Sequence, residues 1–302
     1  MSIAATTARQ VTSSLATGRS RDRTPLSLVF LCALWFSLFF GVLVLIALIV
    51  DTAMAGASRF DSELLTNYAS VVRPETTGFR AGILGTVWLM LFTALFAVPL
   101  GIAAALYLEE LADPTTRWNR FVEVNLQNLA AVPAIVYGLL AVAVMALLGF
   151  QESGIVLGGA LALALLILPV IIITTREAVR AVPREIRDGS LALGATMWQT
   201  TWRQTLPSAV PGIATGTILG LSRAIGEAAP LVVVGLAGSL LFDPTGVLSP
   251  VTALPMQIYS LTSQSREELR VAASAAIIVL LVLVLGLNAL AIFIRNKFQR
   301  SW

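Results

Sequence analysis

Two ionisable side chains, Arg223 and Glu227, lie inside a long apolar stretch of the 302-residue chain. Residues four positions apart share one face of a helix, so this arginine and this glutamate are placed to pair. A charged side chain at the centre of a membrane-spanning helix costs about 2.5–3.5 kcal/mol on the mildest scales, so such residues usually face a polar path or a partner inside a helix bundle. The pair is therefore either a structural salt bridge that fixes helix packing or part of a polar path.

The backbone beside this pair favours the second interpretation. Pro230 has no N–H, so the carbonyl of Gly226 loses its helical donor, and Gly220 and Gly226 allow another backbone to approach closely. The chain is thus locally open on the same stretch that carries the charges. We expect this stretch to admit a ligand, and a guanidinium offers an anion a planar, bidentate donor with permanent charge.

The elements that position the pair must be membrane-spanning helices. Hydrophobic residues make up 57% of the chain and charged residues 12%, whereas soluble domains have about 45–50% and about 25%. The mean hydropathy is +0.86, and these values exclude a water-soluble domain. A bilayer core about 30 Å thick needs about 20 apolar helical residues, and six runs of that size are present: 26–50, 82–108, 128–150, 154–175, 208–238 and 271–294. We predict an all-α integral membrane protein with six transmembrane helices.

The distribution of arginine and lysine predicts the orientation, because short loops rich in these residues stay in the cytoplasm. With the N-terminus inside, fourteen of the 20 Arg and Lys residues lie in cytoplasmic segments and five in external ones, while Arg223 is within a span. Both termini are therefore predicted to be cytoplasmic, with residues 1–25 as a mobile tail and residues 26–302 as the transmembrane domain. The same asymmetry explains the basic charge without a nucleic-acid partner.

Composition also excludes several kinds of chemistry. The chain has no histidine and one cysteine, Cys32, so it cannot form an internal disulfide, a His or Cys metal site or a Cys–His nucleophilic pair. Its one lysine, Lys297, follows Asn296, so no G-x-x-x-x-G-K-[ST] phosphate-binding loop is present. Any nucleotide chemistry must belong to a partner, and we expect no cofactor or metal on this chain itself.

The longest predicted cytoplasmic segment, residues 176–207, has the pattern of a helical hairpin. Pro183 suits the first turn of a helix, which then runs to a left-handed C-cap at Gly194. In the second arm, Trp198 and Trp202 stand one helical turn apart and begin an apolar stripe. An interfacial helix resting on lipid headgroups would show the same stripe, so composition alone leaves both interpretations open.

A residue pattern in this hairpin separates the two interpretations. It resembles the E-A-A-x-x-x-G-x9-I-x-L-P loop of bacterial ABC importer permeases, which docks into a groove on the ATPase subunit. The corresponding positions are Asp188, Gly189, Ser190, Gly194, Leu206 and Pro207, with Gln204 at the position of the isoleucine. Glu, Ala and Ala are usual at the first three of these positions. The resemblance implies that these residues couple the chain to an ATPase.

Three further motifs extend the resemblance to about residues 80–302. They are AVPAIVYG at 131–138, RAIGEAAPL at 223–231 and LPMQIY at 254–259, and the second is the most specific. Together with the hairpin they resemble the phosphate-specific ABC transporter permeases, and the PstA-type subunit in particular. The resemblance implies a type I ABC importer fold in the bacterial inner membrane. It also implies a heterodimer with a PstC-type permease, two PstB-type ATPases that carry ATP and Mg, and an extracytoplasmic phosphate-binding protein.

Within this resemblance, Arg223 is the expected contact for inorganic phosphate, because hydrogen phosphate is a small dianion that a guanidinium can bind through two hydrogen bonds. A free, ionised Glu227 would repel the anion. We therefore expect Glu227 to pair with Arg223 while the path is empty and to be displaced when phosphate arrives. Gly226 and Pro230 would supply the open backbone beside them.

Two other classes of protein are distinguished by particular features of the sequence. A secondary anion transporter or channel would use the same charged pair without an ATPase, but it has no evident need for the hairpin at 176–207. A membrane-embedded enzyme acting on phospholipid headgroups would need clustered carboxylates or histidines, and Glu227 is the only acid within the predicted spans. Glu109, Glu110 and Arg176, at the inner ends of predicted spans, are expected to be interfacial charges rather than a second binding site.

Overall fold

A computed structural model of the chain describes residues 25–113 and 115–298. The chain divides into two compact units, Met1–Asp51 and Thr52–Trp302, which are described separately. In the described residues, regular structure is helical except for one isolated antiparallel bridge between Ile155 and Pro250. The fold is therefore all-α, as the apolar runs predict.

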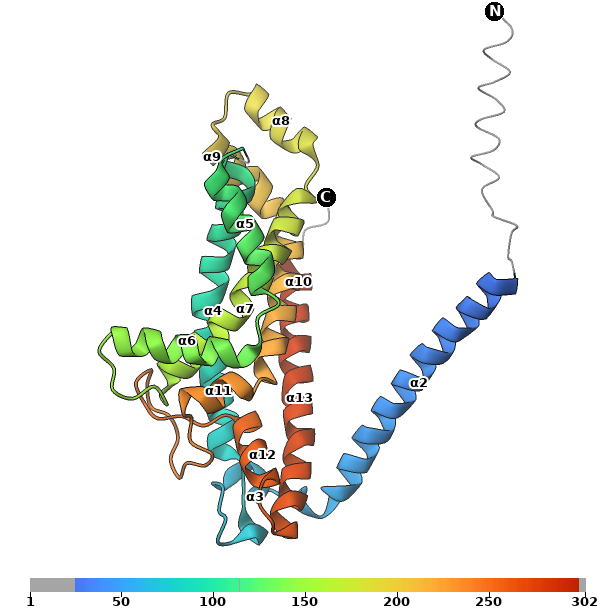
Figure 1. Cartoon of the computed structure of the whole chain (residues 1–302), viewed down its shortest axis with the longest axis vertical. Helices are drawn as coiled ribbons and strands as arrows, with labels where there is room; N and C mark the ends of the chain where they lie inside the picture. The colour runs from blue at the N-terminus through green and yellow to red at the C-terminus, as the bar shows by residue number, and fades with distance from the viewer. Residues whose placement is uncertain (1–24, 114, 299–302) are drawn as a thin grey trace, which may run out of the picture. The chain divides into compact units, whose positions relative to one another are not determined.

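Helix α2, Pro25–Ala55, contains the first predicted span and is the blue helix in Figure 1. Its large apolar side chains are exposed along its length, from Leu28 to Met54. A helix that is hydrophobic all round is stable in lipid or against other apolar helices rather than in water. By length and composition, α2 is able to cross a membrane.

The second unit contains four long helices joined by shorter ones. The long helices are α4 (Arg80–Leu106), α7 (Val156–Arg180), α10 (Leu206–Ile225) and α13 (Glu267–Phe298). The shorter ones are α3 (Glu63–Thr66), α5 (Arg117–Leu129), α6 (Ala134–Leu147), α8 (Arg184–Ala192), α9 (Met197–Thr200), α11 (Ala229–Val234) and α12 (Leu254–Thr262). Single 3-10 turns form η1 (Ala57–Arg59) and η2 (Pro74–Thr76), and π-helical turns form η3 (Tyr107–Leu111) and η4 (Thr201–Thr205).

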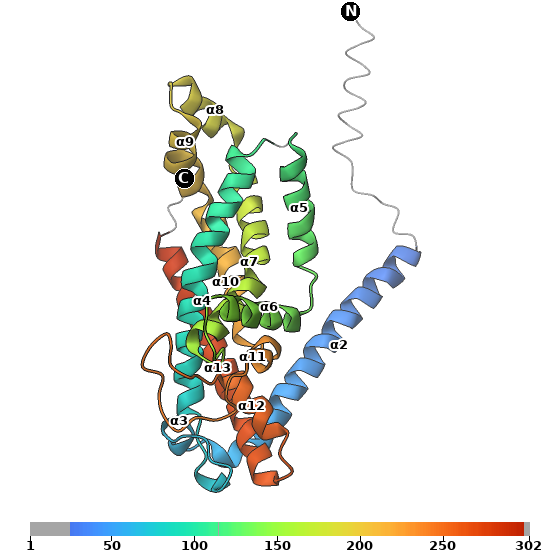
Figure 2. The same cartoon turned by 60° about the vertical axis from the view of Figure 1, so that its left-hand side comes forward.

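Helix α7 is the core of the second unit and packs against both α4 and α10 (Figures 1 and 2). Small residues allow these helices to approach closely. A Cβ at Gly101 of α4 would lie 2.6 Å from Ile171, and a Cβ at Gly212 of α10 would lie 2.6 Å from Ala178. Small residues are typical of such interfaces because van der Waals packing, rather than water exclusion, drives helix association in lipid.

Two of the predicted spans are interrupted in the structure. Residues 128–150 are divided between α5 and α6, which meet at an angle of 117°, and residues 208–238 are divided between α10 and α11. A proline begins the helix after each break: Pro133 directly precedes α6 and Pro230 lies in the first turn of α11, and neither has an N–H to donate to the preceding helix. Contrary to the prediction, neither range forms one unbroken helix.

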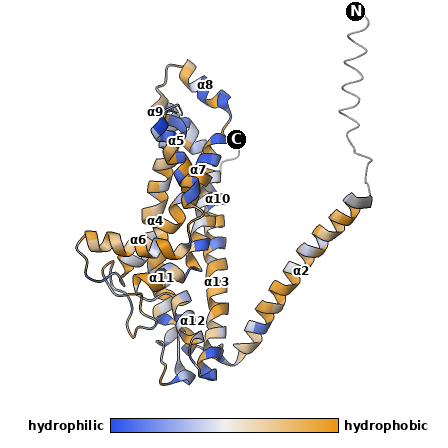
Figure 3. Cartoon of the chain, viewed as in Figure 1, coloured by the Kyte–Doolittle hydropathy of each residue, from blue (hydrophilic) through white to orange (hydrophobic). Residues whose placement is uncertain are grey.

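The described helices that are long and apolar enough to cross a membrane number four: α2, α4 with η3, α7 and α13. The bent pair α5–α6 would provide a fifth, so these criteria do not reproduce the predicted count of six. Helix α10 has 20 residues, but its Gly, Pro, Ser and Thr residues make it less apolar. Figure 3 shows an apolar middle in the second unit, with hydrophilic residues at the end with α8 and α9 and at the end with α12. This arrangement suits a bilayer.

The LPMQIY motif forms α12, which packs against α4 and α13 at the end of the unit opposite to α8. The backbone N–H of Leu254 donates to Thr86 Oγ1 of α4 (2.9 Å). Gln257 is fully buried beside Gly82. The motif is therefore a packing element that fixes the ends of α4 and α13.

Candidate functional site

The predicted charged pair lies at the end of α10. Arg223 is in the last turn of the helix, which ends at Ile225, and its Nε lies 3.5 Å from Glu227 Oε1. The Arg223 side chain is 43% exposed and the Glu227 side chain 26%. The pair therefore forms as the spacing predicts, but it is only partly buried in this chain, and a ligand can reach it from the open side.

A break in the helix separates the two charges. Gly226 caps α10, and its N–H donates to the carbonyl of Arg223 (3.3 Å). Helix α11 then begins with Pro230 in its first turn, where a residue without an N–H leaves no helical bond unmade. The open backbone predicted at Gly226 and Pro230 therefore takes the form of a non-helical interruption at residues 226–228.

The AVPAIVYG motif packs against this break. A Cβ at Gly138 of α6 would lie 2.6 Å from the carbonyl oxygen of Pro230, so a side chain there would separate α6 from α11. Tyr137 is buried, and its hydroxyl donates to the carbonyl of Leu129 (2.5 Å). Two motifs that are far apart in the sequence thus form one structural unit around the charged pair.

The α10 end is also held by a polar contact that sequence reasoning missed. Ser222 Oγ hydrogen-bonds with the Asn288 side chain of α13 (2.5 Å) and with the carbonyl of Ile218 (2.6 Å). Such contacts between membrane helices contribute about 0.6 kcal/mol on average. The only sign of this contact in the sequence is that Ser222 and Asn288 are each a polar residue within an apolar segment. This contact fixes α10 against α13 next to Arg223.

The predicted helical hairpin is present. Helix α8 begins directly after a proline and is followed by Gly194 with a φ of 84°, as predicted. A capping box between Thr196 and Gln199 starts α9. Ser190 Oγ lies 2.9 Å from Thr200 Oγ1 and joins the two arms. The hairpin is therefore an ordered element and not a loose loop.

The residues predicted to couple to an ATPase fall into two groups. Those on the hairpin are Asp188, Gly189, Ser190 and Gly194. Leu206 and Pro207 lie instead in the first turn of α10, where Leu206 packs against a buried cluster that includes Leu106 and Val179. Leu193, next to the left-handed glycine, is 90% exposed and is an apolar residue that the motif does not include. Of these hairpin residues, Asp188, Gly189, Gly194 and Leu193 are exposed and Ser190 is half-buried.

Charged residues form a closely paired cluster between the hairpin and the long helices. Arg176 Nε lies 3.1 Å from Glu109, and Arg176 Nη2 lies 2.8 Å from Glu123 of α5. Arg180 Nε lies 2.7 Å from the other oxygen of Glu109. Sequence reasoning did not bring Glu123 or Arg180 into this group. The mutual neutralisation of these charges supports the structural role expected for Glu109 and Arg176.

Arg187 connects α8 to this cluster. Its Nη2 lies 2.8 Å from Glu110 and donates to the carbonyl of Val179 at 2.6 Å. The Glu110 side chain is only 4% exposed. Among the described residues, no basic side chain pairs with the neighbouring Asp188, which is exposed. The hairpin is thus tied to η3 and α7 through Arg187, and the next residue along α8 is an exposed acid.

The charges of the site are of a kind that is able to bind an anion. Arg223 supplies a permanent charge at an open helix break, and Glu227 supplies a counter-ion. In the part of the chain that the structure describes, no group of three His, Cys, Asp or Glu residues could hold a metal ion.

The fold is that of an ABC importer permease. A chain in the crystal structure of a bacterial alginate ABC transporter, in complex with a periplasmic protein bound to an alginate pentasaccharide, superposes with a TM-score of 0.68. The match covers 94% of this chain and 99% of that chain, at 17% sequence identity. The family described as "Binding-protein-dependent transport system inner membrane component" matches residues 97–301. The chain belongs to this family, so it is a membrane permease component of a transport system.

Two relatives specify the branch of the family that this chain resembles. The phosphate transport system permease protein PstA of Mycobacterium leprae is 35% identical over 249 residues, covering 81% of this chain and 79% of that protein. PstA 1 of Mycobacterium tuberculosis (strain ATCC 25618 / H37Rv) is 37% identical over 228 residues, covering 74% of this chain and 72% of that protein. The resemblance to PstA-type permeases that the sequence motifs predict is confirmed.

Proposed function

We propose that the chain is the PstA-type permease subunit of an ATP-driven importer of inorganic phosphate and forms one half of its transmembrane path. The other half would come from a PstC-type permease subunit. Phosphate would arrive from an extracytoplasmic phosphate-binding protein, and two PstB-type ATPases would hydrolyse ATP with Mg. Two observations support this proposal: the relatives are phosphate transport permeases, and the Arg223 guanidinium is a suitable donor for an anion.

The observation that carries the proposal is the half-exposed guanidinium of Arg223 at the helix break. A charge at this depth is costly unless a polar path or a partner covers it. Arg223 has one carboxylate at 3.5 Å, which leaves guanidinium N–H groups available to a dianion. When phosphate arrives, its oxygens take two of these donors and Glu227 turns aside. The break at Gly226 gives the backbone room for this change.

The hairpin is the proposed docking element for the ATPase. It is ordered and tied to α7 and to η3, which continues α4, so a movement of the ATPase would reach the long helices. Leu193 offers an apolar contact and Asp188 an acidic one on the exposed surface. A secondary anion transporter or channel would need no such element, and its phosphate uptake would continue without the ATPase gene.

We further propose that both termini face the cytoplasm, which places the hairpin there as well. Cysteines at Ser265 and Ala192, both exposed, would test this in a Cys32→Ala background. An impermeant thiol reagent added to intact cells should label position 265 and not position 192. Labelling of position 192 alone would reverse the orientation.

The double variant Arg223→Leu with Glu227→Leu tests the role in transport. Replacing a buried ion pair with apolar residues is often neutral or stabilising, so the variant should insert and assemble normally. It lacks the cation that phosphate requires, so uptake of radiolabelled phosphate should fall to background. Uptake is measured at limiting concentration in a host without other phosphate importers, with membrane level and ATPase assembly determined in parallel.

A matched control is the pair Glu177 and Arg180, which is also 3.5 Å apart but lies at the more exposed end of α7. Its double leucine variant also removes one of the two arginines that pair with Glu109, so the amount of permease should fall, but uptake normalised to permease in the membrane should stay near the wild-type rate. Wild-type uptake by the Arg223→Leu, Glu227→Leu variant would show that the pair serves packing alone, and the proposed translocation role would be lost.

A further inference from the structure

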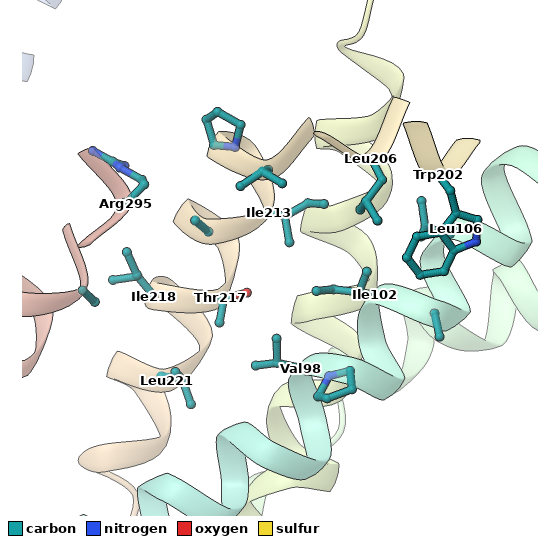
Figure 4. A pocket seen from close by; sticks show the side chains of 16 residues that line it. Val98, Ile102, Leu106, Trp202, Leu206, Ile213, Thr217, Ile218, Leu221 and Arg295 are labelled. Carbon is teal, nitrogen blue, oxygen red and sulfur yellow. The ribbon is translucent and has the colours of Figure 1, made fainter. Parts of the chain in front are cut away.

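An apolar groove of about 800 Å³ opens between α4, η4, α10 and α13. Figure 4 shows its walls: Val98, Ile102 and Leu106 come from α4, Trp202 from η4, Leu206, Ile213, Thr217, Ile218 and Leu221 from α10, and Arg295 from α13. Its volume is within the range of about 300–1,000 Å³ typical of ligand sites. The groove is therefore large enough for an acyl chain.

This groove is separate from the proposed phosphate site. Its α10 wall includes Leu206, Val210, Ala214, Thr217 and Leu221, which recur at helical spacing, with Pro211, Ile213 and Ile218 beside them. Arg223 follows Leu221 by two residues, and two residues turn a helix by about 200°, so its side chain points to the other side. An apolar wall would also disfavour a dianion. The groove therefore suits an apolar ligand.

A guanidinium lines this apolar groove. Arg295 Nη1 donates to Thr215 Oγ1 (2.8 Å), and its other nitrogens contact the amide oxygen of Asn296. No acidic side chain within residues 25–113 and 115–298 pairs with Arg295, in contrast to Arg176 and Arg187. The positive charge of Arg295 is therefore available to an anionic group.

A ligand with a charged group at Arg295 and a hydrocarbon chain along Val98 and Leu221 would match both the charge and the apolar walls of the groove. We propose that the groove binds an anionic phospholipid of the cytoplasmic leaflet. Its phosphate would contact Arg295, and one acyl chain would fill the space between α4 and α10. Trp202 lies near the end of the groove at which α10 begins (Figure 4), and tryptophan prefers the interface between headgroups and acyl chains. The site does not depend on the identity of the transported anion.

The test is lipid retention by the purified permease complex. The complex is washed in detergent containing a mixture of phosphatidylglycerol and phosphatidylcholine, and the retained lipids are counted by native mass spectrometry. Arg295→Gln should lower phosphatidylglycerol retention about fivefold, because one Arg near a membrane surface is worth about 1 kcal/mol for anionic lipid. Arg295→Lys should retain most of the binding. Ala214→Phe should fill the groove and reduce retention of both lipids.

Two control variants separate the groove from general effects of charge and bulk. Arg270→Gln removes a charge at the opposite end of α13, and Leu285→Phe adds bulk on an exposed face of the same helix. Both should retain lipid as the wild type does. Unchanged phosphatidylglycerol retention in Arg295→Gln and Ala214→Phe would overturn the proposal. Disulfide formation between a cysteine at position 214 and a cysteine in the partner permease would also overturn it, because a protein helix would then fill the groove.

Discussion

The two charged regions of the second unit are built in opposite ways. Near the hairpin, Arg187 lies 2.8 Å from a glutamate that is 4% exposed, and Arg176 has carboxylates at 3.1 Å and 2.8 Å. At the helix break, Arg223 has one carboxylate at 3.5 Å and is 43% exposed. The first arrangement pairs its charges closely within the chain, whereas the second leaves binding capacity for a ligand.

This difference predicts where mutations act. A charge that is buried and closely paired becomes costly when its partner is removed. A charge that is loosely paired and half-exposed can lose its partner at small cost to stability, although its loss removes a ligand contact. Substitutions in the cluster should therefore lower the amount of folded protein, and substitutions at the break should lower transport by folded protein.

The largest expected effect on stability is that of Arg187→Leu. It leaves the Glu110 carboxylate buried without its cation, and breaking a buried pair in this way costs about 3–5 kcal/mol. The variant should reach the membrane at a much lower level, and the purified complex should unfold at a lower temperature. Quantitative blotting of membranes and a thermal melt of the complex measure these effects.

The control is the double variant Glu110→Leu with Arg187→Leu, which removes both charges and should recover much of the lost protein. If Arg187→Leu were present at the wild-type level and failed to transport phosphate, the contrast between a structural cluster and a ligand-binding helix break would be wrong. The cluster would then have a direct role in transport rather than a structural one.

The next effect is that of Arg223→Lys on transport. Lysine keeps the charge but loses the planar, bidentate geometry, and a hydrogen bond to a charged group is worth about 1.5–3 kcal/mol. Phosphate uptake should therefore fall about ten- to a hundredfold, while membrane level and melting temperature remain near the wild-type values. Uptake at limiting phosphate, normalised to permease in the membrane, measures the effect.

Arg180→Lys in the cluster is the matched control. Arg180 is 46% exposed, and a lysine can maintain an ion pair of this partly exposed kind, which contributes about 0–1 kcal/mol. Its uptake should remain near the wild-type rate. Equal losses in the two variants would mean that uptake responds to any arginine at the ends of these helices, and the distinction between the two regions would not hold.

Local signals allowed the hairpin and the charged pair to be predicted from the sequence. A left-handed C-cap depends on the residue at one position, so Gly194 identifies the end of α8 without knowledge of the fold. The spacing of Arg223 and Glu227 is also a local property. Although residues 226–228 are not helical, the backbone there stays close enough to a helical turn for the two side chains to meet.

The remaining features depend on contacts between distant segments. The prolines that lie inside helices in the structure are Pro99, Pro169 and Pro211. A proline alone therefore does not predict a break, and the interruptions at Pro133 and Pro230 require the packing of α6 on α11. The partners of Arg187 come from η3 and α7, which no spacing rule relates to α8. The groove between α4, α10 and α13 is likewise a product of tertiary packing.

A smaller effect is expected from Gly194→Ala in the hairpin. The φ of 84° at this position costs a residue with a Cβ about 1–2 kcal/mol. The strain should distort the turn between α8 and α9 and reduce the amount of ATPase that co-purifies with the permease, with little loss of permease itself. The ratio of ATPase to permease after purification measures the effect.

Gly149→Ala provides the same backbone strain in a different place. Gly149 follows α6 and has a φ of 83°, and a Cβ at this position, like one at Gly194, would meet no neighbouring atom within 4 Å. This variant should retain the ATPase at the wild-type ratio. Full retention by Gly194→Ala together with normal uptake would instead favour an interfacial role for the hairpin on the membrane surface.

The smallest expected effect is that of Tyr137→Phe, which tests whether the open region around Arg223 and the helix break extends into α6. The Tyr137 hydroxyl donates to the carbonyl of Leu129 across the bend between α5 and α6, and the loss of one such bond costs about 0.5–1.5 kcal/mol. The complex should melt a few degrees lower, and uptake should stay above about half of the wild-type rate because Arg223 is unchanged. Tyr259→Phe, at an exposed position of α12, should change neither quantity. A loss of uptake as large as that of Arg223→Lys, with unchanged melting, would place the phenol itself on the phosphate path and extend the open region into α6.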